Sequence, residues 1–285
     1  MFSQFDISEL KVALYEAAEE IKKLQSQAQI SSKTSIVDLV TTADLKSEEI
    51  LINKIQKIFP NDGIISEESE PINENSNRKW VIDPLDGTVN YANNIPQVAI
   101  TILLVEDNIP IQAIVLDIYR DHIYEGYKGY GAFKDGIKLV ISKKTEMKKA
   151  LVATGFPYDR VINSHQYIPT FETILKNSGG IRRYGSAALD VCWIADNKFD
   201  AYYEFFIKPW DTLGASLILD EAGGCVEDET ERFPSMKSNL IIASNSSIHK
   251  EFKELVLSNI SQDLKTKIIL IKKRPRQDSN LRHQV

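Results

Sequence analysis

Two carboxylates stand three residues apart in the segment "WVIDPLDGTVNY", at Asp83 and Asp86. The apolar residues before Asp83 predict a buried strand, and an unpaired carboxylate at the end of such a strand is costly. Pro84 fixes one backbone torsion, so both acids can be held convergent, and Gly87 has no side chain to block a ligand. Two anions held this close need a cation between them, or one must be protonated. Oxygen ligands with no Cys or His nearby favour Mg²⁺ or Mn²⁺ over zinc.

Further acids follow apolar residues elsewhere in the chain. They are Glu67 in "IISEES", Asp211 in "KPWDTLGAS" and Asp44 in "TTAD". Each acid also has an ordinary structural interpretation, because Asp-Pro and Asp-Gly are common turn dipeptides. Taken singly, Glu67 could be a surface acid, and Asp211 and Asp44 could be helix N-caps. Together, acids at the ends of several elements predict a site for more than one metal ion and a phosphate group.

The segments that must position these acids in the first half of the chain are two helices and a set of strands. Apolar residues recur at helical spacing over 7–25, and a strand at 37–40 leads into a second amphipathic helix that ends at Phe59. "GIISEES" and "KWVID" predict short buried strands. Residues 97–139 alternate strand and turn signals, which predicts antiparallel hairpins. The glycine-rich "GYKGYGAFKDG" within them lacks the spacing of a nucleotide-binding loop and predicts a hairpin turn.

After Lys143 strands and helices alternate, which predicts an α/β unit. One of its helices starts near Asp211 and ends at Gly223–Gly224, a helix-stop signal. We place the boundary within 136–145, which divides the chain into an α+β metal-binding domain over 1–140 and an α/β domain over 141–262. Residues 263–285 are predicted to be a basic, disordered tail, with a nucleic-acid-binding arm as the alternative.

The composition is that of an ordinary globular protein. The chain has 285 residues, of which 43% are hydrophobic and 26% charged, enough for two domains without disulfides. The net charge of −6 argues against nucleic acid as a partner, and an anionic substrate would need local positive charge. Two distant cysteines and a polar N-terminus predict a reducing, cytoplasmic compartment. The longest apolar run, 98–105, is too short to span a membrane.

The acidic segments carry a resemblance to a known family. "WVIDPLDGTVNY" resembles the first signature of the inositol monophosphatase family, D-P-[IL]-D-G-T-x-N-[FY], and "PWDTLGASLILDEAGG" resembles the second signature of the same family. The blocks "DLVTTAD", "SEES", "RRYGSAALDVCWIA" and "FDAYYE" match in order between Leu10 and Ile260. The family belongs to the Mg²⁺-dependent, Li⁺-sensitive phosphatases. The resemblance therefore implies a layered αβαβα sandwich and the hydrolysis of phosphate monoesters.

The resemblance also implies a role for each matching residue near the metals. The implied metal ligands are Glu67, Asp83, the backbone carbonyl of Leu85, Asp86 and Asp211. Asp83 would bridge two Mg²⁺ ions, and a third, weaker ion could join. In the family, water on the first metal attacks phosphorus in line with the departing alkoxide. Thr88 and Glu67 would orient this water, and Asp44 would hold the Thr88 hydroxyl.

The implied substrate contacts come from several segments. They are Gly87, Thr88, Gly185, Ser186, Ala187, Glu204 and Asp211. Glu204 matches the family's ligand for inositol hydroxyls, a role that suits a carboxylate because it can accept two neighbouring O–H groups. Lys33 matches a mobile lysine near the third metal. Two small-residue departures, Ser66 and the order Gly214–Ala215, affect no implied ligand but leave the substrate preference less certain.

The resemblance favours an inositol-1-monophosphatase that acts on a small phosphorylated polyol or sugar. Fructose-1,6-bisphosphatase, alone or as a dual activity, is the first alternative, followed by 3′-phosphoadenosine-5′-phosphate phosphatase. The segments "FDAYYE" and "RRYGSAALD" favour the inositol phosphatases over these alternatives. A regulatory partner-binding protein on the same scaffold is the alternative outside the enzymes. Because family members are commonly homodimers, a homodimer is expected.

Overall fold

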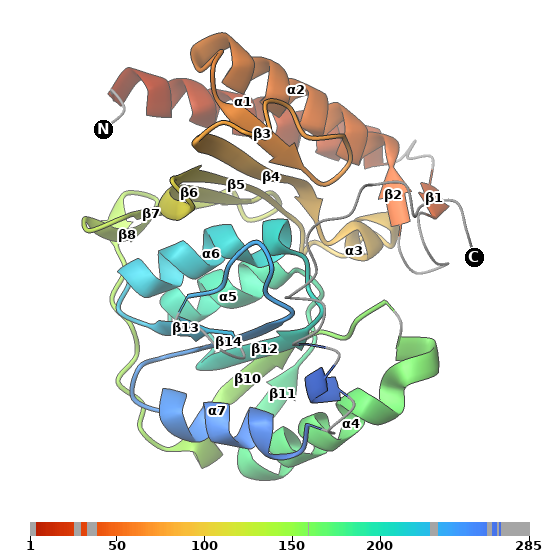
Figure 1. Ribbon diagram of the computed structural model, residues 1–285, viewed down its shortest axis with the longest axis vertical. Helices are drawn as coiled ribbons and strands as arrows, with labels where there is room; N and C mark the ends of the chain where they lie inside the picture. Colours follow the sequence, from red (N-terminus) through yellow and green to blue (C-terminus); the bar gives the residue numbers. More distant parts are fainter. Residues whose placement is uncertain are drawn as a thin grey trace.

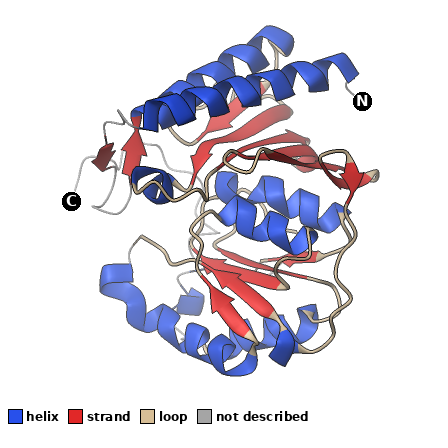
Figure 2. Cartoon of the chain, turned by 180° about the vertical axis from the view of Figure 1, so that it is seen from behind, coloured by secondary structure: helices blue, strands red, loops and turns tan. Residues whose placement is uncertain are grey.

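Five layers make up the protein, in the order helix, sheet, helix, sheet, helix (Figure 1). The computed structural model describes residues 4–25, 30–32, 39–158, 160–228, 233–260, 264–266 and 268. Viewed from behind, two helices lie between the two sheets, and further helices cover the outer face of each sheet (Figure 2). The layered αβαβα sandwich expected from the sequence is confirmed.

The first outer layer contains α1 (Gln4–Leu24) and α2 (Thr42–Ile58). The apolar stripe of α1, with Leu14 and Ile21 fully buried, packs with α2 against the seven-stranded sheet and forms one hydrophobic core. α2 begins at its N-cap Thr41, whose hydroxyl accepts from the backbone N–H of Ala43. The short strands β1 (Ile30–Ser32) and β2 (Leu39–Thr41) pair antiparallel just before α2.

The seven-stranded sheet positions the first acids. Its strands, in spatial order, are β3 (Gly63–Ser66), β4 (Arg78–Asp86), β5 (Ala99–Glu106), β6 (Ile109–Asp117), β7 (His122–Tyr127), β8 (Gly131–Lys134) and β9 (Ile137–Lys138). β3 and β4 are parallel, whereas each later neighbour is antiparallel. Side chains alternate along β4, so Trp80 and Ile82 face the outer helices and Val81 faces the middle layer. The short helix α3 (Thr88–Ala92) follows β4.

The middle layer contains α5 (Ala187–Ala195) and α6 (Pro209–Glu221), between the two sheets (Figure 2). Every residue of α5 is buried. A helix between two sheets needs apolar side chains all round, and "AALDVCWIA" is apolar at every position except Asp190. These helices form a second core with the inner faces of both sheets.

The second sheet completes the sandwich. Its spatial order is β11 (Gly180–Arg182), β10 (Leu151–Thr154), β12 (Ala201–Phe205), β14 (Leu240–Ser244) and β13 (Cys225–Glu227). β10 is parallel to β11 and β12, and β14 is antiparallel to both of its neighbours. α4 (Arg160–Asn177) and α7 (His249–Ser258) cover the outer face (Figure 1). The short 3₁₀ helix η2 (Met147–Lys149) precedes β10.

The start of the predicted tail packs on this outer layer. Residues 264–266 and 268 are helical, and Leu264 and Ile268 are buried in the third core, which lies between the second sheet and the outer helices. The rest of 263–285 lies outside the described residues. The division into domains at 136–145 remains a prediction; β9 closes the first sheet within this range.

The glycine-rich segment is the hairpin β7–β8, as predicted. The backbone N–H groups of Gly129 and Gly131 donate to the two carboxylate oxygens of Glu221, at 2.8 and 2.9 Å. Glu221 ends α6 and is the glutamate of the second signature. Its carboxylate therefore binds the C-terminal end of α6 to the β7–β8 hairpin of the first sheet. The N-terminal end of the same helix carries Asp211.

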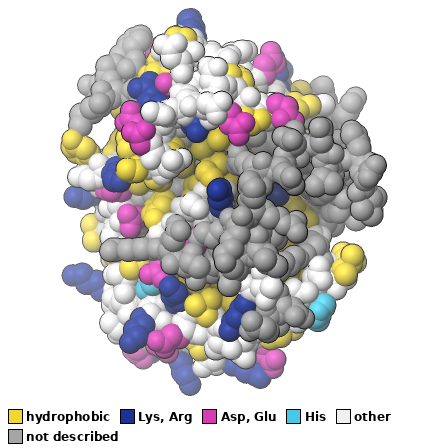
Figure 3. Space-filling model, in the orientation of Figure 1, with side chains coloured by type: hydrophobic (Ala, Val, Ile, Leu, Met, Phe, Trp, Pro, Cys, Tyr) yellow, Lys and Arg dark blue, Asp and Glu magenta, His cyan; other side chains and the backbone are white. Residues whose placement is uncertain are grey.

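The surface shows mixed charge. Over the part of one face that the structure describes, Lys and Arg side chains lie among Asp and Glu side chains (Figure 3). This distribution differs from the basic stripe of a nucleic-acid-binding face. Among the described residues, no helix combines the length and apolar character needed to cross a bilayer.

Candidate metal and phosphate site

Three acids from three separate elements converge. Each of Glu67, Asp83 and Asp211 offers a carboxylate oxygen that lies within 4.8 Å of the others. Because β3 and β4 are parallel, Glu67, directly after β3, reaches the same edge of the sheet as Asp83. Asp211 comes from the first turn of α6, which begins at Pro209. Asp83 is 1% exposed, and the other two are partly exposed at the opening of the site.

Asp86 lies beside this group but is directed toward α5. The pairing of β4 with β5 shifts register between Asp83 and Asp86, which changes the direction of the second acid. Asp86 Oδ2 accepts from Ser186 Oγ at 2.5 Å and from the Ala188 backbone N–H at 2.9 Å. A carboxylate at a helix N-terminus is favourable because the unpaired N–H groups there carry partial positive charge. The sequence did not indicate this structural role for Asp86.

Burial and neighbouring acids act together on the carboxylates of the cluster. Burial, together with the charges of Glu67, Asp86 and Asp211, raises the pKa of Asp83 well above its usual range. Burial and neighbouring acids likewise raise the pKa of Asp211. Burial raises the pKa of Asp86 to about 6, against hydrogen bonds from Ser186 and Ala188 that lower it. An all-oxygen donor set of neighbouring, largely buried carboxylates fits a hard divalent cation such as Mg²⁺.

Thr88 lies next to this cluster. Its Oγ1 is 3.2 Å from Asp44 Oδ1 and 3.3 Å from the carbonyl oxygen of Leu85, so it can donate to either. Asp44 is buried and accepts at Oδ2 from the Thr41 backbone N–H at 2.9 Å and from Thr41 Oγ1 at 2.5 Å. Asp44 therefore stabilises the start of α2 and also reaches Thr88. Sequence reasoning missed Ser47, whose hydroxyl donates to the Pro84 carbonyl at 2.7 Å and ties α2 to the "DPLD" turn.

Glycine is required at two points where the chain passes the site. Gly87 has φ +97, and a Cβ there would lie 2.7 Å from the Gln97 carbonyl oxygen. Gly185 has φ +84 and lies near Gly87, so neither position suits an L side chain. The amide of Asn90 donates to the carbonyls of Gln97 at 2.9 Å and Tyr184 at 2.7 Å. Asn90 thus ties α3 to the segment before α5, a role that the sequence did not indicate.

Glu204 lies on β12 and faces the middle layer. It is 8% exposed, and burial raises its pKa to about 7, against a lowering hydrogen bond from Tyr202. The Tyr202 hydroxyl donates to Glu204 Oε2. A Cβ on Gly155 would lie 2.0 Å from the same oxygen. Sequence reasoning missed Tyr202 and Gly155, because an aromatic strand residue and a glycine after a strand carry no chemical signal. Lys33 lies outside the described residues.

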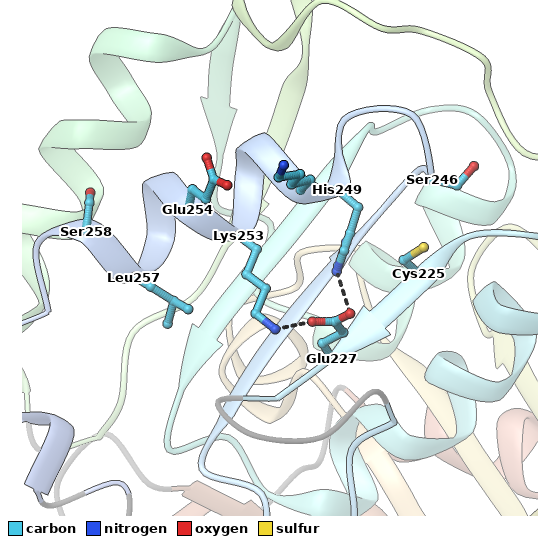
Figure 4. Close-up of a pocket in the computed structure, with 9 residues that line it drawn as sticks. Cys225, Glu227, Ser246, His249, Lys253, Glu254, Leu257 and Ser258 are labelled. Atoms are coloured by element: carbon cyan, nitrogen blue, oxygen red, sulfur yellow. Dashed lines mark hydrogen bonds and ion pairs between the residues drawn. The ribbon is translucent and has the colours of Figure 1, made fainter.

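A separate groove lies between the edge strand β13 and α7 (Figure 4). Glu227 points into it and forms an ion pair with Lys253, and its Oε1 is 3.6 Å from Nε2 of His249. Burial lowers the pKa of His249, against the attraction of Glu227. The charge of Glu227 is thus paired within the groove.

Comparisons with known proteins identify the family of this chain. The sequence matches the inositol monophosphatase family over residues 3–264. It is 35% identical to inositol monophosphatase 1 of Bos taurus over 263 residues, which covers 87% of this chain and 93% of the relative. It is 32% identical to the Nus factor SuhB of Pseudomonas aeruginosa over 233 residues, covering 80% and 86%. It is 37% identical to a fructose-1,6-bisphosphatase/inositol-1-monophosphatase of Aquifex aeolicus over 212 residues, covering 74% and 79%.

The fold also matches solved structures of similar proteins. The extragenic suppressor protein suhB from Bartonella henselae superposes with a TM-score of 0.84 at 28% identity, covering 89% of this chain and 99% of that one. An αβαβα sandwich with a carboxylate cluster that fits a divalent cation defines the class of metal-dependent phosphatases. The chain belongs to the inositol monophosphatase family.

Proposed function

We propose that this protein is a Mg²⁺-dependent phosphate monoester hydrolase that acts on inositol 1-phosphate and related polyol monophosphates. The observation that carries this proposal is the convergence of Glu67, Asp83 and Asp211 within 4.8 Å of one another. Thr88 lies beside them, with its hydroxyl 3.2 Å from Asp44. Family membership supports the reaction class.

The metal ligands in this proposal are Glu67, Asp83, the Leu85 carbonyl, Asp86 and Asp211. They would hold two to three Mg²⁺ ions, with Mn²⁺ as a possible substitute. Bound Mg²⁺ supplies positive charge to the phosphate and to the leaving oxygen. The cluster then attracts an anion although the chain carries a net charge of −6.

Thr88 and Glu67 would orient the attacking water. When the Thr88 hydroxyl donates its proton to Asp44, its lone pairs are free to accept from that water. Glu67 would accept the other O–H of the water and take its proton as the oxygen bonds to phosphorus. Backbone N–H groups of Gly87 and Thr88 would face the phosphate oxygens. A new P–O bond forms as the bond to the alcohol breaks, and the alkoxide leaves with a proton from solvent.

The alcohol part of the substrate would lie toward α5 and β12. Glu204 would accept its hydroxyl groups, with Asp211 and the segment Gly185–Ser186–Ala187 completing the contacts. Ser186 already donates to Asp86, so this segment lies at the boundary between the acidic cluster and Glu204.

Two alternatives have support from named relatives. The Aquifex aeolicus relative, whose name gives both activities, favours a dual activity on fructose 1,6-bisphosphate. The relatives named Nus factor SuhB favour a regulatory partner-binding role on the same scaffold. 3′-Phosphoadenosine-5′-phosphate phosphatase is the remaining candidate. A cytoplasmic location and a homodimer remain predictions.

Phosphate release tests the proposal. The wild type and Asp83→Asn are compared in Mg²⁺ on inositol 1-phosphate, fructose 1,6-bisphosphate and 3′-phosphoadenosine 5′-phosphate. We expect the highest kcat/KM on inositol 1-phosphate and a loss of about a hundredfold or more in the variant. If no ester is hydrolysed although Mg²⁺ binds, the hydrolase proposal fails and the partner-binding role gains support.

A further inference from the structure

We propose that Tyr202 is a positioning residue for the substrate's alcohol group, because its hydroxyl holds one oxygen of Glu204 and leaves the other to accept polyol hydroxyls. This inference rests on the proposed function of the site and adds a residue and a selectivity to it. The ligand class is a polyol with neighbouring hydroxyl groups rather than any phosphate ester.

The backbone of β12 places the two side chains together. Residues two apart on a strand share a face, so Tyr202 and Glu204 both point toward the middle layer, where Tyr202 belongs to the central core. Tyr203, between them, points to the opposite face and packs in the outer core. The Tyr202 side chain is fully buried, and its hydroxyl donates to Glu204 Oε2. A rigid ring in a packed core holds that donor in one place.

Gly155 closes the other side of the carboxylate. A Cβ at this position would lie 2.0 Å from Oε2 and 2.3 Å from Oε1 of Glu204. The carboxylate therefore rests directly over the Gly155 backbone, which leaves it little freedom to rotate. Because Oε2 already accepts from Tyr202, Oε1 is the oxygen left for a ligand, and 8% of the residue remains exposed.

Charged groups from neighbouring elements also act on Glu204. The cations are Arg183, after β11, and Arg160, at the start of α4, whereas the anions are Asp86, Asp190 and Asp211. Arg160 also donates to the Pro157 carbonyl at 3.3 Å. The Tyr202 hydroxyl is a neutral donor, so it holds one oxygen of the Glu204 carboxylate without adding to the charges around it.

The test compares Tyr202→Phe with the matched control Tyr203→Phe, in the full-length protein with Mg²⁺. The substrates are inositol 1-phosphate and 4-nitrophenyl phosphate, which has no alcohol hydroxyls beside its ester. We expect Tyr202→Phe to raise KM for inositol 1-phosphate about fivefold, the effect of one hydrogen bond, and to change kcat by less than about twofold. The same variant should leave 4-nitrophenyl phosphate unaffected, and Tyr203→Phe should affect neither substrate. An equal effect of Tyr202→Phe on both substrates would overturn the inference.

A second measurement does not depend on turnover. The pKa of Glu204 is followed by NMR with ¹³C-labelled glutamate, and Glu204→Gln identifies the signal. Loss of the Tyr202 donor should raise this pKa, because the hydrogen bond favours the anion, whereas Tyr203→Phe should not change it. An unchanged pKa in Tyr202→Phe refutes the positioning role. If the wild type hydrolyses no ester, the proposed function fails, and this titration still decides whether Tyr202 holds Glu204.

Discussion

Replacement of Asp83 by Asn should make the metal-free protein more stable while abolishing its response to Mg²⁺. Asp83 is 1% exposed and lies among acids that raise its pKa. The folded state therefore disfavours the charged form, which destabilises the metal-free fold above the ordinary carboxyl pKa. Asn keeps the shape and can still accept, through Oδ1, the Leu85 backbone N–H that donates at 2.9 Å to Asp83. The substitution removes the charge and hence the penalty.

The pKa of the neighbouring Asp86 indicates how much a buried acid in this cluster lowers the free energy of unfolding. Burial raises its pKa from 3.8 to about 6, and each tenfold change in proton affinity corresponds to about 1.4 kcal/mol. This gives about 3 kcal/mol of destabilisation from one such acid. Asp83 is less exposed than Asp86, at 1% against 8%, and burial raises its pKa in the same direction, so Asp83→Asn should be stabilised by an amount of that order. For a chain of this length that amounts to roughly 5–10 °C in Tm.

The sign of the pH dependence follows from the raised pKa. Below about pH 3 the acid is protonated in both the folded and unfolded states, so wild type and variant should be equally stable. As the pH rises, the unfolded state ionises first, and the advantage of the variant should grow until the pH exceeds the raised pKa. Urea unfolding in EDTA at several values between pH 4 and pH 8 measures this difference.

Mg²⁺ should reverse the order of stability. Wild type should gain about 4.1 kcal/mol when Mg²⁺ exceeds its dissociation constant a thousandfold, and the variant should gain little. The control is Asp62→Asn, because Asp62 accepts from Arg78 Nε and Trp80 Nε1 at 2.9 Å and its loss should destabilise the fold. The reasoning is wrong if Asp83→Asn lowers metal-free stability as Asp62→Asn does, or if Mg²⁺ stabilises Asp83→Asn as much as wild type.

Two further predictions concern backbone contacts, the first at Gly87 beside the site and the second at Glu221 at the far end of α6. Gly87→Ala should lower stability by about 1–3 kcal/mol and reduce activity, because its φ is +97 and its Cβ would lie 2.7 Å from a carbonyl oxygen. Gly214→Ala, with neighbours no nearer than 3.9 Å, should match or exceed wild type in thermal melting, and a large loss there would contradict the packing. Glu221→Ala should lower Tm by roughly 4–8 °C, about 2 kcal/mol, because it leaves two N–H donors in the 129–131 turn without their acceptor. Glu221→Gln should lose less, and equal losses in the two variants would count against this role.

Much of the fold was predictable because its signals are local. Helical spacing identified α1 and α2, and strand and turn patterns identified the hairpins of the first sheet. The alternation of elements after Lys143 indicated the second sheet with its helices. The two acidic signatures, with the "SEES" block, indicated the family and implied the acids Glu67, Asp83, Asp86 and Asp211 as metal ligands. In each case the evidence lies within a window of a few residues, where dihedral preferences and side-chain periodicity act.

Other parts of the site depended on contacts between distant segments. Asp86 and Ser186 are 100 residues apart, and no local pattern predicts that the acid would lie at the start of α5. The same holds for Tyr202 and Gly155, which are apolar or featureless in sequence but enclose Glu204 in the fold.

The sequence by itself determined which residues could do chemistry, roughly where many of the helices and strands lie, and that acids follow several of those elements. Only the tertiary structure decided which acids meet, which one is directed toward a helix, and which neutral neighbours hold the substrate-side carboxylate. The reason is physical. Propensity and capping act along the chain, whereas convergence of side chains depends on how whole layers pack, and that packing is a sum over contacts between residues remote in sequence.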